Sequence, residues 1–175
     1  MLVRIQRCQP FMKQISPNVY VGSDDDYEKV KDDKSWAILR CAKFGPGGHK
    51  DVLGYDTQAA PEGKNQYWVK RGNLMALNLL DLDDPNFVPA EAIQQGLDFI
   101  RDHVDDNKVL VACNAGHSRG PTMGLMWLRT IGRMPYSFIH SEKVYRNDIY
   151  RKFDPSPGIE QFARMHWSSL LEGKV

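Results

Sequence analysis

Short apolar runs alternate with amphipathic segments along this chain. Apolar runs that contain β-branched residues predict buried strands, because a strand covered on both faces is apolar throughout. Apolar residues at three- and four-residue steps predict helices that pack one face on a sheet. The predicted strands are residues 19–21, 37–41, 74–80 and 109–113. The predicted helices are residues 25–31, 89–104, 121–131, 136–145 and 158–171.

The order of these elements predicts an α/β fold with a central, mostly parallel sheet flanked by helices. The segment at 121–131 differs from the other predicted helices, because apolar side chains surround it almost entirely. Its apolar residues are Met123, Leu125, Met126, Trp127, Leu128 and Ile131. We expect a central, buried helix there. The chain of 175 residues has the size of one domain, so a single domain over 1–175 is expected.

Residues 44–72 are the least regular region, because they are rich in Gly and Pro and lie between two predicted strands. A structureless loop of this length is uncommon in a compact domain unless it serves a site or carries small elements of its own. The segment also contains basic and aromatic residues, among them Lys50, Tyr67 and Trp68. Two interpretations stay open. The segment is either a cleft wall that selects substrates or a surface excursion whose aromatic side chains hold it to the core.

Charge and composition exclude several classes of function. The formal net charge of +1 gives no electrostatic reason to expect nucleic acid or an anionic membrane as a partner. Residues 1–7 lack the apolar region of a signal peptide, and no apolar run is long enough to span a bilayer. Three cysteines, an odd number, do not make a disulfide framework. We therefore expect a cytoplasmic protein, and the sequence leaves its oligomeric state open.

The candidate chemistry lies between the apolar run at 109–112 and the helix that Pro121 begins. Proline is tolerated at the start of a helix, where its missing N–H costs nothing. The residues between must curl tightly, and such a curl points backbone N–H groups into a concave nest that favours a dianion such as phosphate. The predicted phosphate-binding residues are Asn114, Ala115, Gly116, His117, Ser118 and Arg119.

Cys113 and Arg119 stand at the two ends of this loop. The positive field of a helix N-terminus favours the thiolate, which is the nucleophilic form of cysteine. The planar guanidinium of Arg119 can hold two oxygens of a phosphoryl group, a geometry that lysine cannot copy. The pair therefore predicts attack on phosphorus by sulfur.

The spacing of Cys113, Gly116 and Arg119 resembles the phosphate loop of the cysteine-dependent phosphatase superfamily, and the loop is most similar to the dual-specificity branch. The layout is also similar to bacterial and phage-encoded members of that branch. The similarity covers most of the chain and includes residues 15–23, 36–41, 77–83, 98–100 and 154–159. It implies a dual-specificity phosphatase fold and hydrolysis of phosphomonoesters through a cysteinyl-phosphate intermediate. It implies neither a metal nor an organic cofactor.

The resemblance also implies an aspartic acid that protonates the departing oxygen and later activates water. The candidates are Asp81, Asp83 and Asp84. Measured back from the Asp-Phe-Ile at 98–100, Asp83 stands at the position that the resemblance gives to the acid. The alternative is that these residues cap the helix predicted from 89 or solvate a turn.

Three positions depart from the family pattern. Ala112 replaces a histidine that helps to organise the loop, and Gly120 replaces a serine or threonine whose hydroxyl stabilises the departing sulfur. Loss of a hydrogen bond to a charged atom, about 1.5–3 kcal/mol, would slow the second chemical step by about tenfold to a hundredfold. Ser118 and Thr122 are the candidates for supplying a hydroxyl instead. Ser156 stands where relatives have an asparagine that braces the loop. It either acts as a shorter and weaker brace or has an ordinary role in a helix turn.

Two further residues carry open alternatives. His117 occupies a variable loop position and either contacts substrate or is simply exposed. Cys41 resembles the back-door cysteine of the lipid-phosphatase members, a redox partner that can pair with the nucleophile on oxidation. The other interpretation of Cys41 is a small buried apolar residue.

Three functions fit these residues. The first is a protein tyrosine or dual-specificity phosphatase that acts on a phosphorylated protein or peptide. The second is the same chemistry on a phosphoinositide, an RNA 5′ phosphate or a sugar phosphate, although the loop contains no lysine and only His117 is basic at the relevant position. The third is a weakly active, phosphate-binding pseudophosphatase, which the changes at Ala112 and Gly120 favour and the retention of Cys113 and Arg119 disfavours.

Overall fold

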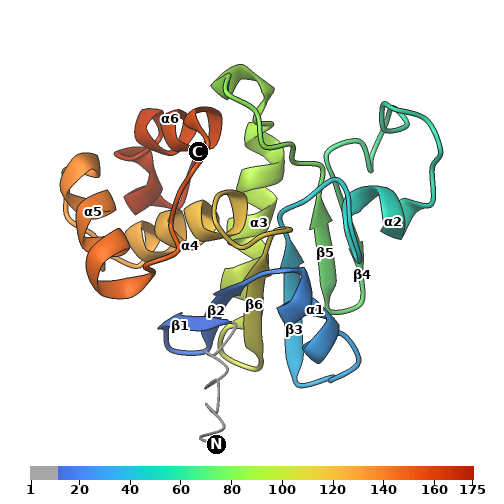
Figure 1. The fold of residues 1–175 in the computed structure, drawn as a ribbon, viewed down its shortest axis with the longest axis horizontal. Helices are drawn as coiled ribbons and strands as arrows, with labels where there is room; N and C mark the ends of the chain where they lie inside the picture. Colours follow the sequence, from blue (N-terminus) through green and yellow to red (C-terminus); the bar gives the residue numbers. More distant parts are fainter. Residues whose placement is uncertain (1–11) are drawn as a thin grey trace, which may run out of the picture.

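One six-stranded sheet organises the protein, and the computed structural model describes residues 12–175 around it (Figure 1). The strand order is β1-β2-β6-β3-β5-β4. The four central strands are parallel and an antiparallel strand closes each edge, which confirms the predicted sheet. Residues 1–11, with the stretch considered for a signal peptide, lie outside the described residues. The strands are β1 (Lys13–Ser16), β2 (Val19–Gly22), β3 (Trp36–Arg40), β4 (Trp68–Arg71), β5 (Leu74–Leu77) and β6 (Lys108–Ala112).

Helices cover both faces of the sheet, with α3 and α4 against one face and α1 against the other. Figure 1 shows α5 and α6 on the far side of α4 from the sheet. The helices are α1 (Asp24–Val30), α2 (His49–Leu53), α3 (Ala90–His103), α4 (Arg119–Thr130), α5 (Phe138–Val144) and α6 (Pro157–Met165). Short helical turns lie at Pro85–Phe87, Tyr145–Ile149 and Ser169–Glu172.

Two predicted helices have different bounds in the structure. The helix predicted from residue 136 begins at Phe138, because the hydroxyl of Ser137 accepts a hydrogen bond from the His140 N–H and caps it. The helix predicted over 158–171 ends at Met165. Two contacts of Trp167 interrupt its continuation. The Trp167 ring packs edge-on against the Phe138 ring, with 5.1 Å between the centroids, and the Trp167 carbonyl accepts a hydrogen bond from Nε of Arg129.

The strand predicted over 74–80 ends at Leu77. Beyond Leu77 the backbone leaves the sheet ladder. The carbonyl of Leu79 instead accepts hydrogen bonds from the backbone N–H of Lys43 and from Nη1 of Arg119, each at 2.9 Å. The carboxyl ends of the parallel strands meet at this edge, which is where α/β sheets place their ligands.

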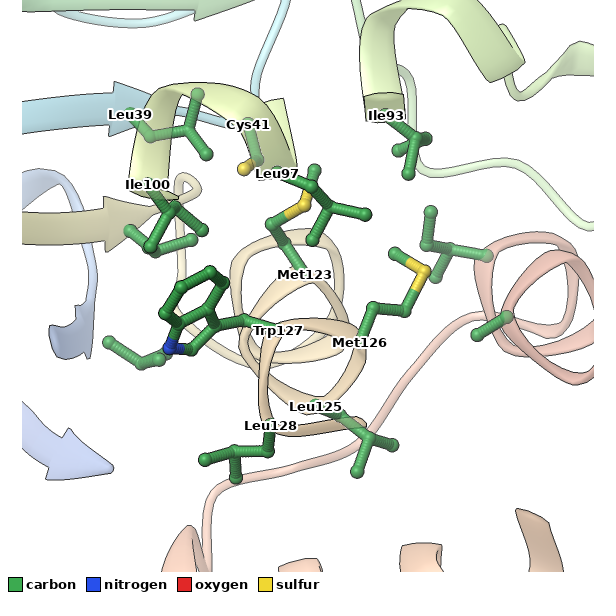
Figure 2. Close-up of a cluster of buried hydrophobic side chains, with 14 of the residues drawn as sticks. Leu39, Cys41, Ile93, Leu97, Ile100, Met123, Leu125, Met126, Trp127 and Leu128 are labelled. Carbon is green, nitrogen blue, oxygen red and sulfur yellow. The ribbon is translucent and has the colours of Figure 1, made fainter. Parts of the chain in front are cut away.

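Helix α4 is the centre of the main core, as its apolar pattern predicts. Figure 2 shows its side chains directed toward the sheet, α3 and the C-terminal helices at once. Met123, Leu125 and Met126 are fully buried. The prediction is wrong for Ile131, which follows the last turn and is 40% exposed. A buried helix of this kind holds its N-terminus in a fixed place relative to the sheet.

Residues 44–72 are not a structureless loop. They contain α2, and they supply β4, which pairs with β5 and extends the sheet. The imidazole of His49 is buried in the middle of the segment. Its Nε2–H donates to the carbonyl of Asn65 at 2.7 Å, and its Nδ1 accepts from the Tyr55 hydroxyl at 3.1 Å. This tautomer follows because a carbonyl can only accept.

The same segment also forms a wall. A cavity of about 530 Å³ lies between it and the chain that follows β5. The segment contributes Ala59, Ala60, Gln66 and Tyr67 to the lining, and residues 78–91 contribute Asn78, Leu80, Leu82, Asn86, Phe87, Pro89, Ala90 and Glu91. Both interpretations of 44–72 therefore describe part of it: buried groups hold it to the protein, and its outer part lines a cavity.

The neutral state of His49 predicts that the fold loses stability in mild acid. Burial lowers the pKa of His49; the hydrogen bond to the Asn65 carbonyl acts against this, and the positive charge of Lys43 acts with it. A histidine whose folded pKa is lowered contributes stability above its unfolded pKa, about 6.5, and that contribution is lost as the pH falls through the folded value. Urea unfolding at pH 8 and pH 5 should therefore show a larger loss in the parent than in His49→Gln. Equal losses in the two proteins would contradict the prediction.

Candidate active site

The loop from Cys113 to Ser118 joins the end of β6 to the start of α4. Gly116 adopts φ +75°, and a Cβ atom there would lie 3.1 Å from the carbonyl oxygen of Gly22, so both its backbone conformation and its surroundings require glycine. No acceptor among residues 12–175 bonds the backbone N–H groups of residues 114–119. Unpaired amides at the N-terminus of a buried helix make an anion nest. Cys113, at the start of this nest, is 2% exposed.

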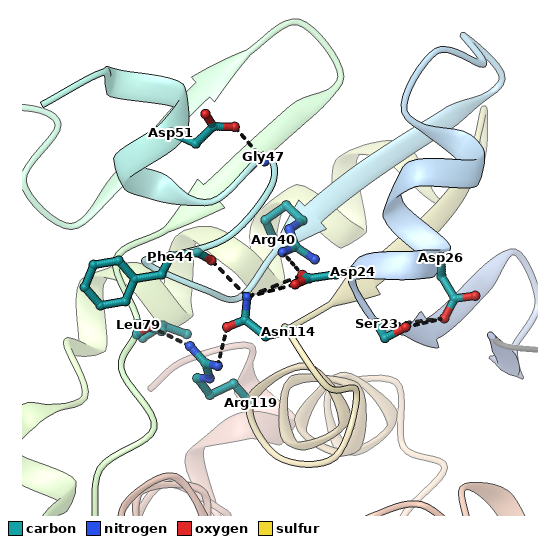
Figure 3. Close-up of polar contacts among 10 residues, drawn as sticks. All are labelled: Ser23, Asp24, Asp26, Arg40, Phe44, Gly47, Asp51, Leu79, Asn114 and Arg119. Carbon is teal, nitrogen blue, oxygen red and sulfur yellow. Dashed lines mark hydrogen bonds and ion pairs between the residues drawn. The ribbon is translucent and has the colours of Figure 1, made fainter.

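Arg119 is the first residue of α4, and its guanidinium is held at both terminal nitrogens (Figure 3). Nη1 donates to the carbonyl of Leu79 at 2.9 Å, and Nη2 donates to Oδ1 of Asn114 at 2.7 Å. Nε is buried and has no partner within the described part of the chain. The fork therefore keeps an unused donor beside the nest.

Residues 150–156 brace the loop from outside. The hydrogen bonds under 3.1 Å that join the two segments are Tyr150 Oη to Gly116 O (2.7 Å), His117 Nδ1 to Lys152 O (3.0 Å), Asp154 N to His117 O (2.9 Å) and Ser156 N to Ser118 Oγ (2.8 Å). Burial raises the pKa of Tyr150, so its hydroxyl remains the donor at neutral pH. The imidazole of His117 is exposed, with its Nδ1–H occupied by this brace.

Asp81 completes the brace, a role that the sequence did not indicate. Its Oδ1 accepts hydrogen bonds from Ser118 Oγ at 2.7 Å and from Ser156 Oγ at 2.6 Å. Two short hydroxyl side chains and one carboxylate thus connect the segment that follows β5, the loop from Cys113 to Ser118 and the start of α6.

The other two candidate acids are in different situations. Asp84 caps the turn Pro85–Phe87, because its Oδ1 accepts from the Asn86 N–H at 2.9 Å. The capping interpretation is thus correct for Asp84, although for this turn and not for α3. Asp83 is exposed and makes no hydrogen bond or ion pair within residues 12–175. Its carboxyl group is therefore accessible to solvent.

The two hydroxyls considered as substitutes at position 120 are both engaged elsewhere. Ser118 Oγ donates to Asp81, and Thr122 Oγ1 donates to the carbonyl of Ser118 at 2.7 Å. Gly120 itself lies against the backbone, because a Cβ atom there would be 2.9 Å from the Cys113 nitrogen and 3.1 Å from the Ala112 carbonyl carbon. The contact between α4 and the end of β6 therefore leaves no room for a side chain at position 120.

Cys41 follows β3 directly beside the loop, since its backbone N–H donates to the carbonyl of Ala112 at 2.7 Å. Burial raises the pKa of the Cys41 thiol strongly, and the nearby Cys113 thiol raises it further. The positive charge of Arg119 lowers it. Figure 2 shows the Cys41 sulfur directed toward Leu97 and Met123. Its location fits both interpretations, a small apolar core residue and a thiol within the electrostatic reach of Cys113.

Among residues 12–175, no group of three or more His, Cys, Asp and Glu side chains could hold a metal ion. No helix in that range has the length and apolar character needed to cross a bilayer.

The close approach at Gly120 makes a testable prediction. In an unobstructed helix, Gly→Ala stabilises by about 0.5–1 kcal/mol. Here the added Cβ meets two backbone atoms that cannot rotate away, so Gly120→Ala and Gly120→Ser should each destabilise by about 1–3 kcal/mol. Urea unfolding of both variants measures this. An increase in unfolding free energy for either variant would show that the loop can move to accept the side chain.

Three solved structures show what this architecture is similar to. DUSP15 shares 16% identity at a TM-score of 0.60, with 93% of this chain and 91% of that chain covered. The human tyrosine phosphatase-like serine/threonine/tyrosine-interacting protein shares 16% identity at a TM-score of 0.59, with 91% and 97% covered. PTPMT1 in complex with PI(5)P shares 14% identity at a TM-score of 0.59, with 93% and 98% covered.

No protein-family model and no curated protein matches the sequence. The similarity therefore lies in the fold and extends over nearly the whole chain. This protein has the fold of the dual-specificity and tyrosine phosphatases.

Proposed function

We propose that this protein is a cysteine-dependent phosphatase that hydrolyses phosphomonoesters of protein side chains. Its substrates are either phosphotyrosine alone or phosphotyrosine together with phosphoserine and phosphothreonine. One observation carries the proposal: a thiol, a guanidinium with an unused donor and six unpaired backbone N–H groups belong to one loop at the start of a buried helix. Such a loop is complementary to a phosphoryl group with two negative charges. The fold shared with known phosphatases supports the same conclusion.

In the first step, the Cys113 thiolate attacks phosphorus and the bond to the ester oxygen breaks. The loop amides and Arg119 hold the three other phosphoryl oxygens while charge develops on them. Asp83 gives its proton to the departing oxygen, so the alcohol leaves neutral. The product of this step is a cysteinyl-phosphate.

In the second step, the Asp83 carboxylate takes a proton from water, whose oxygen attacks phosphorus while the S–P bond breaks. Inorganic phosphate and the Cys113 thiolate result. Within the described residues, no free hydroxyl faces this sulfur from position 118, 120 or 122. The second step should therefore be the slower one. These groups cover every chemical role, so the proposal requires neither a metal nor an organic cofactor.

The cavity beside residues 78–91 contains no residue of the loop, and we propose it as an accessory surface for the chain of a polypeptide substrate. Its lining combines apolar side chains such as Leu80 and Phe87 with polar ones such as Gln66 and Asn78, which suits a peptide chain. The second candidate is a phosphoinositide, because a structure of this fold is described as a complex with PI(5)P. The third is phosphate binding with little turnover, since another neighbour is named an interacting protein.

The chemistry is tested first by substitution of the three proposed catalytic residues. Cys113→Ser should abolish hydrolysis of p-nitrophenyl phosphate, and Arg119→Lys should lower kcat/KM by about a hundredfold or more. Asp83→Asn should lower kcat/KM, which reports the first step, by about a hundredfold on an alkyl phosphate and much less on an aryl phosphate, whose leaving group needs less protonation. Asp84→Asn is the matched control and should resemble the parent. Undiminished turnover by Cys113→Ser would overturn the proposed function.

A substrate panel then separates the candidates. Phosphotyrosine, phosphothreonine and phosphoserine peptides, phosphoinositide vesicles and a triphosphorylated RNA are compared at equal concentration, with phosphate release as the readout. Faster release from the peptides supports the proposal. Preference for the vesicles or the RNA would assign the second candidate, and binding of phosphopeptides without release would assign the third.

Cys41 is proposed as a redox partner of Cys113. Peroxide would oxidise the Cys113 thiolate to a sulfenic acid, and the Cys41 thiol would then displace water to form a disulfide. A disulfide protects the nucleophile from irreversible oxidation, so Cys41→Ser should recover less activity than the parent after peroxide and then reductant. Equal recovery would leave Cys41 as a core residue. Mass spectrometry of the oxidised parent should show the 41–113 disulfide.

A further inference from the structure

Arg40 is a buried cation next to the phosphate loop. It is the last residue of β3, its side chain is 0% exposed, and its guanidinium lies over the Tyr27 ring at 5.0 Å from the centroid. A buried charge is strongly unfavourable unless an opposite charge accompanies it. Asp24, at the start of α1, supplies that charge through an ion pair with Nη2 of Arg40. The requirement of Arg40 for a counter-ion therefore fixes the Asp24 carboxylate.

Asp24 in turn fixes Asn114, the residue after the nucleophile. The backbone N–H of Asp24 donates to the Asn114 carbonyl at 3.0 Å. The side-chain Nδ2 of Asn114 donates to both carboxylate oxygens of Asp24, at 3.3 and 3.2 Å, and to the carbonyl of Phe44 at 3.0 Å. Helix α1 and the start of the 44–72 segment thus both hold this one side chain (Figure 3).

These partners decide the orientation of the Asn114 amide. Asp24 and the Phe44 carbonyl are acceptors only, so the NH₂ group must face them and the Oδ1 atom must face the other way. That oxygen accepts from Nη2 of Arg119 at 2.7 Å. Gly45 closes over the same group, because a Cβ atom there would lie 2.5 Å from the Asn114 Nδ2. The amide has no second orientation that satisfies these neighbours.

We propose that Asn114 is a positioning residue: held by Asp24 and Arg40, it presets the guanidinium of Arg119 to receive a phosphoryl group. With Nη2 bound to Asn114 and Nη1 to the Leu79 carbonyl, the guanidinium plane is fixed before substrate arrives. A preset donor costs no reorganisation when charge develops in the transition state. This inference rests on the proposed function, because it assigns the residues that prepare one of its binding groups.

Kinetics of Asn114 and Asp24 variants on p-nitrophenyl phosphate test the inference. Asn114→Ala should lower kcat/KM by about tenfold to a hundredfold, since Arg119 loses its charge-assisted acceptor. Asn114→Asp should be worse, because it places a second carboxylate against Asp24. Asp24→Asn keeps an oxygen that can accept from Arg40 and from the Asn114 Nδ2 group, so this variant should retain more activity than Asp24→Ala. Asp25→Asn, an exposed neighbour on α1, is the matched control and should equal the parent.

Binding of inorganic phosphate gives a readout that does not depend on turnover. In a Cys113→Ser background, calorimetry should show Kd about tenfold higher when Asn114→Ala is added. The effect should vanish when Arg119→Lys is also present, because Asn114 would then have no guanidinium to position. A merely structural role would instead weaken binding by the same factor in both backgrounds.

The outcomes separate the inference from the function on which it rests. If Cys113→Ser retains turnover, the proposed function fails whatever Asn114 does. If Cys113→Ser is inactive while Asn114→Ala and Asp24→Ala both keep kcat/KM and Kd within about twofold of the parent, the function stands and the positioning role is overturned. Should Asn114→Ala not fold, Asp24→Asn against Asp24→Ala carries the test, and equal loss in those two variants would contradict the inference.

Discussion

The close packing of α4 on the end of β6 is the constraint on which the site depends. At Gly120 the helix approaches the Cys113 nitrogen so closely that no side chain fits between them. The chain can enter the helix from the strand only by curling through a left-handed residue, Gly116. The curl takes the amides of residues 114–119 out of any protein hydrogen bond within the described part of the chain. The anion nest is thus a consequence of how a buried helix meets a buried strand.

A loop with unpaired amides needs support from outside, and three separate parts of the chain supply it. Residues 150–156 hold Gly116, His117 and Ser118. Asp24 holds Asn114 through both backbone and side chain. The segment that follows β5 contributes the Leu79 carbonyl to Arg119 and the Asp81 carboxylate to Ser118. Each support fixes the loop through atoms other than its amides, so the nest stays rigid and still free to bind an anion.

The parts of the fold that the sequence predicted are those in which the signal is local. The run at 109–112 followed by Pro121 indicates a strand, a loop and a helix within one short stretch, and the structure has them there. Both edge strands, β1 and β4, were missed. Half of each is exposed and polar, Lys13 and Gln14 in β1 and Lys70 and Arg71 in β4, so neither has the apolar pattern of a buried strand. The brace at Asp81 joins residues 37 and 75 positions apart, and the bond from Asn114 to Asp24 spans 90. No pattern within one segment indicates such pairs.

Ser156 and Gly120 belong to the same local arrangement of the loop. The backbone N–H of Ser156 donates to Ser118 Oγ, and both hydroxyls donate to Asp81. The Ser118 hydroxyl donates to Asp81 and is therefore not available to the Cys113 sulfur. Gly120 has no hydroxyl that could replace it. Asp81 is held by two hydroxyls, whereas Asp83 makes no hydrogen bond or ion pair within residues 12–175. Under the proposed mechanism, the loop is strongly braced for binding phosphate but lacks a hydroxyl donor for the departing thiolate. Hydrolysis of the intermediate is then the step that the proposed site assists least.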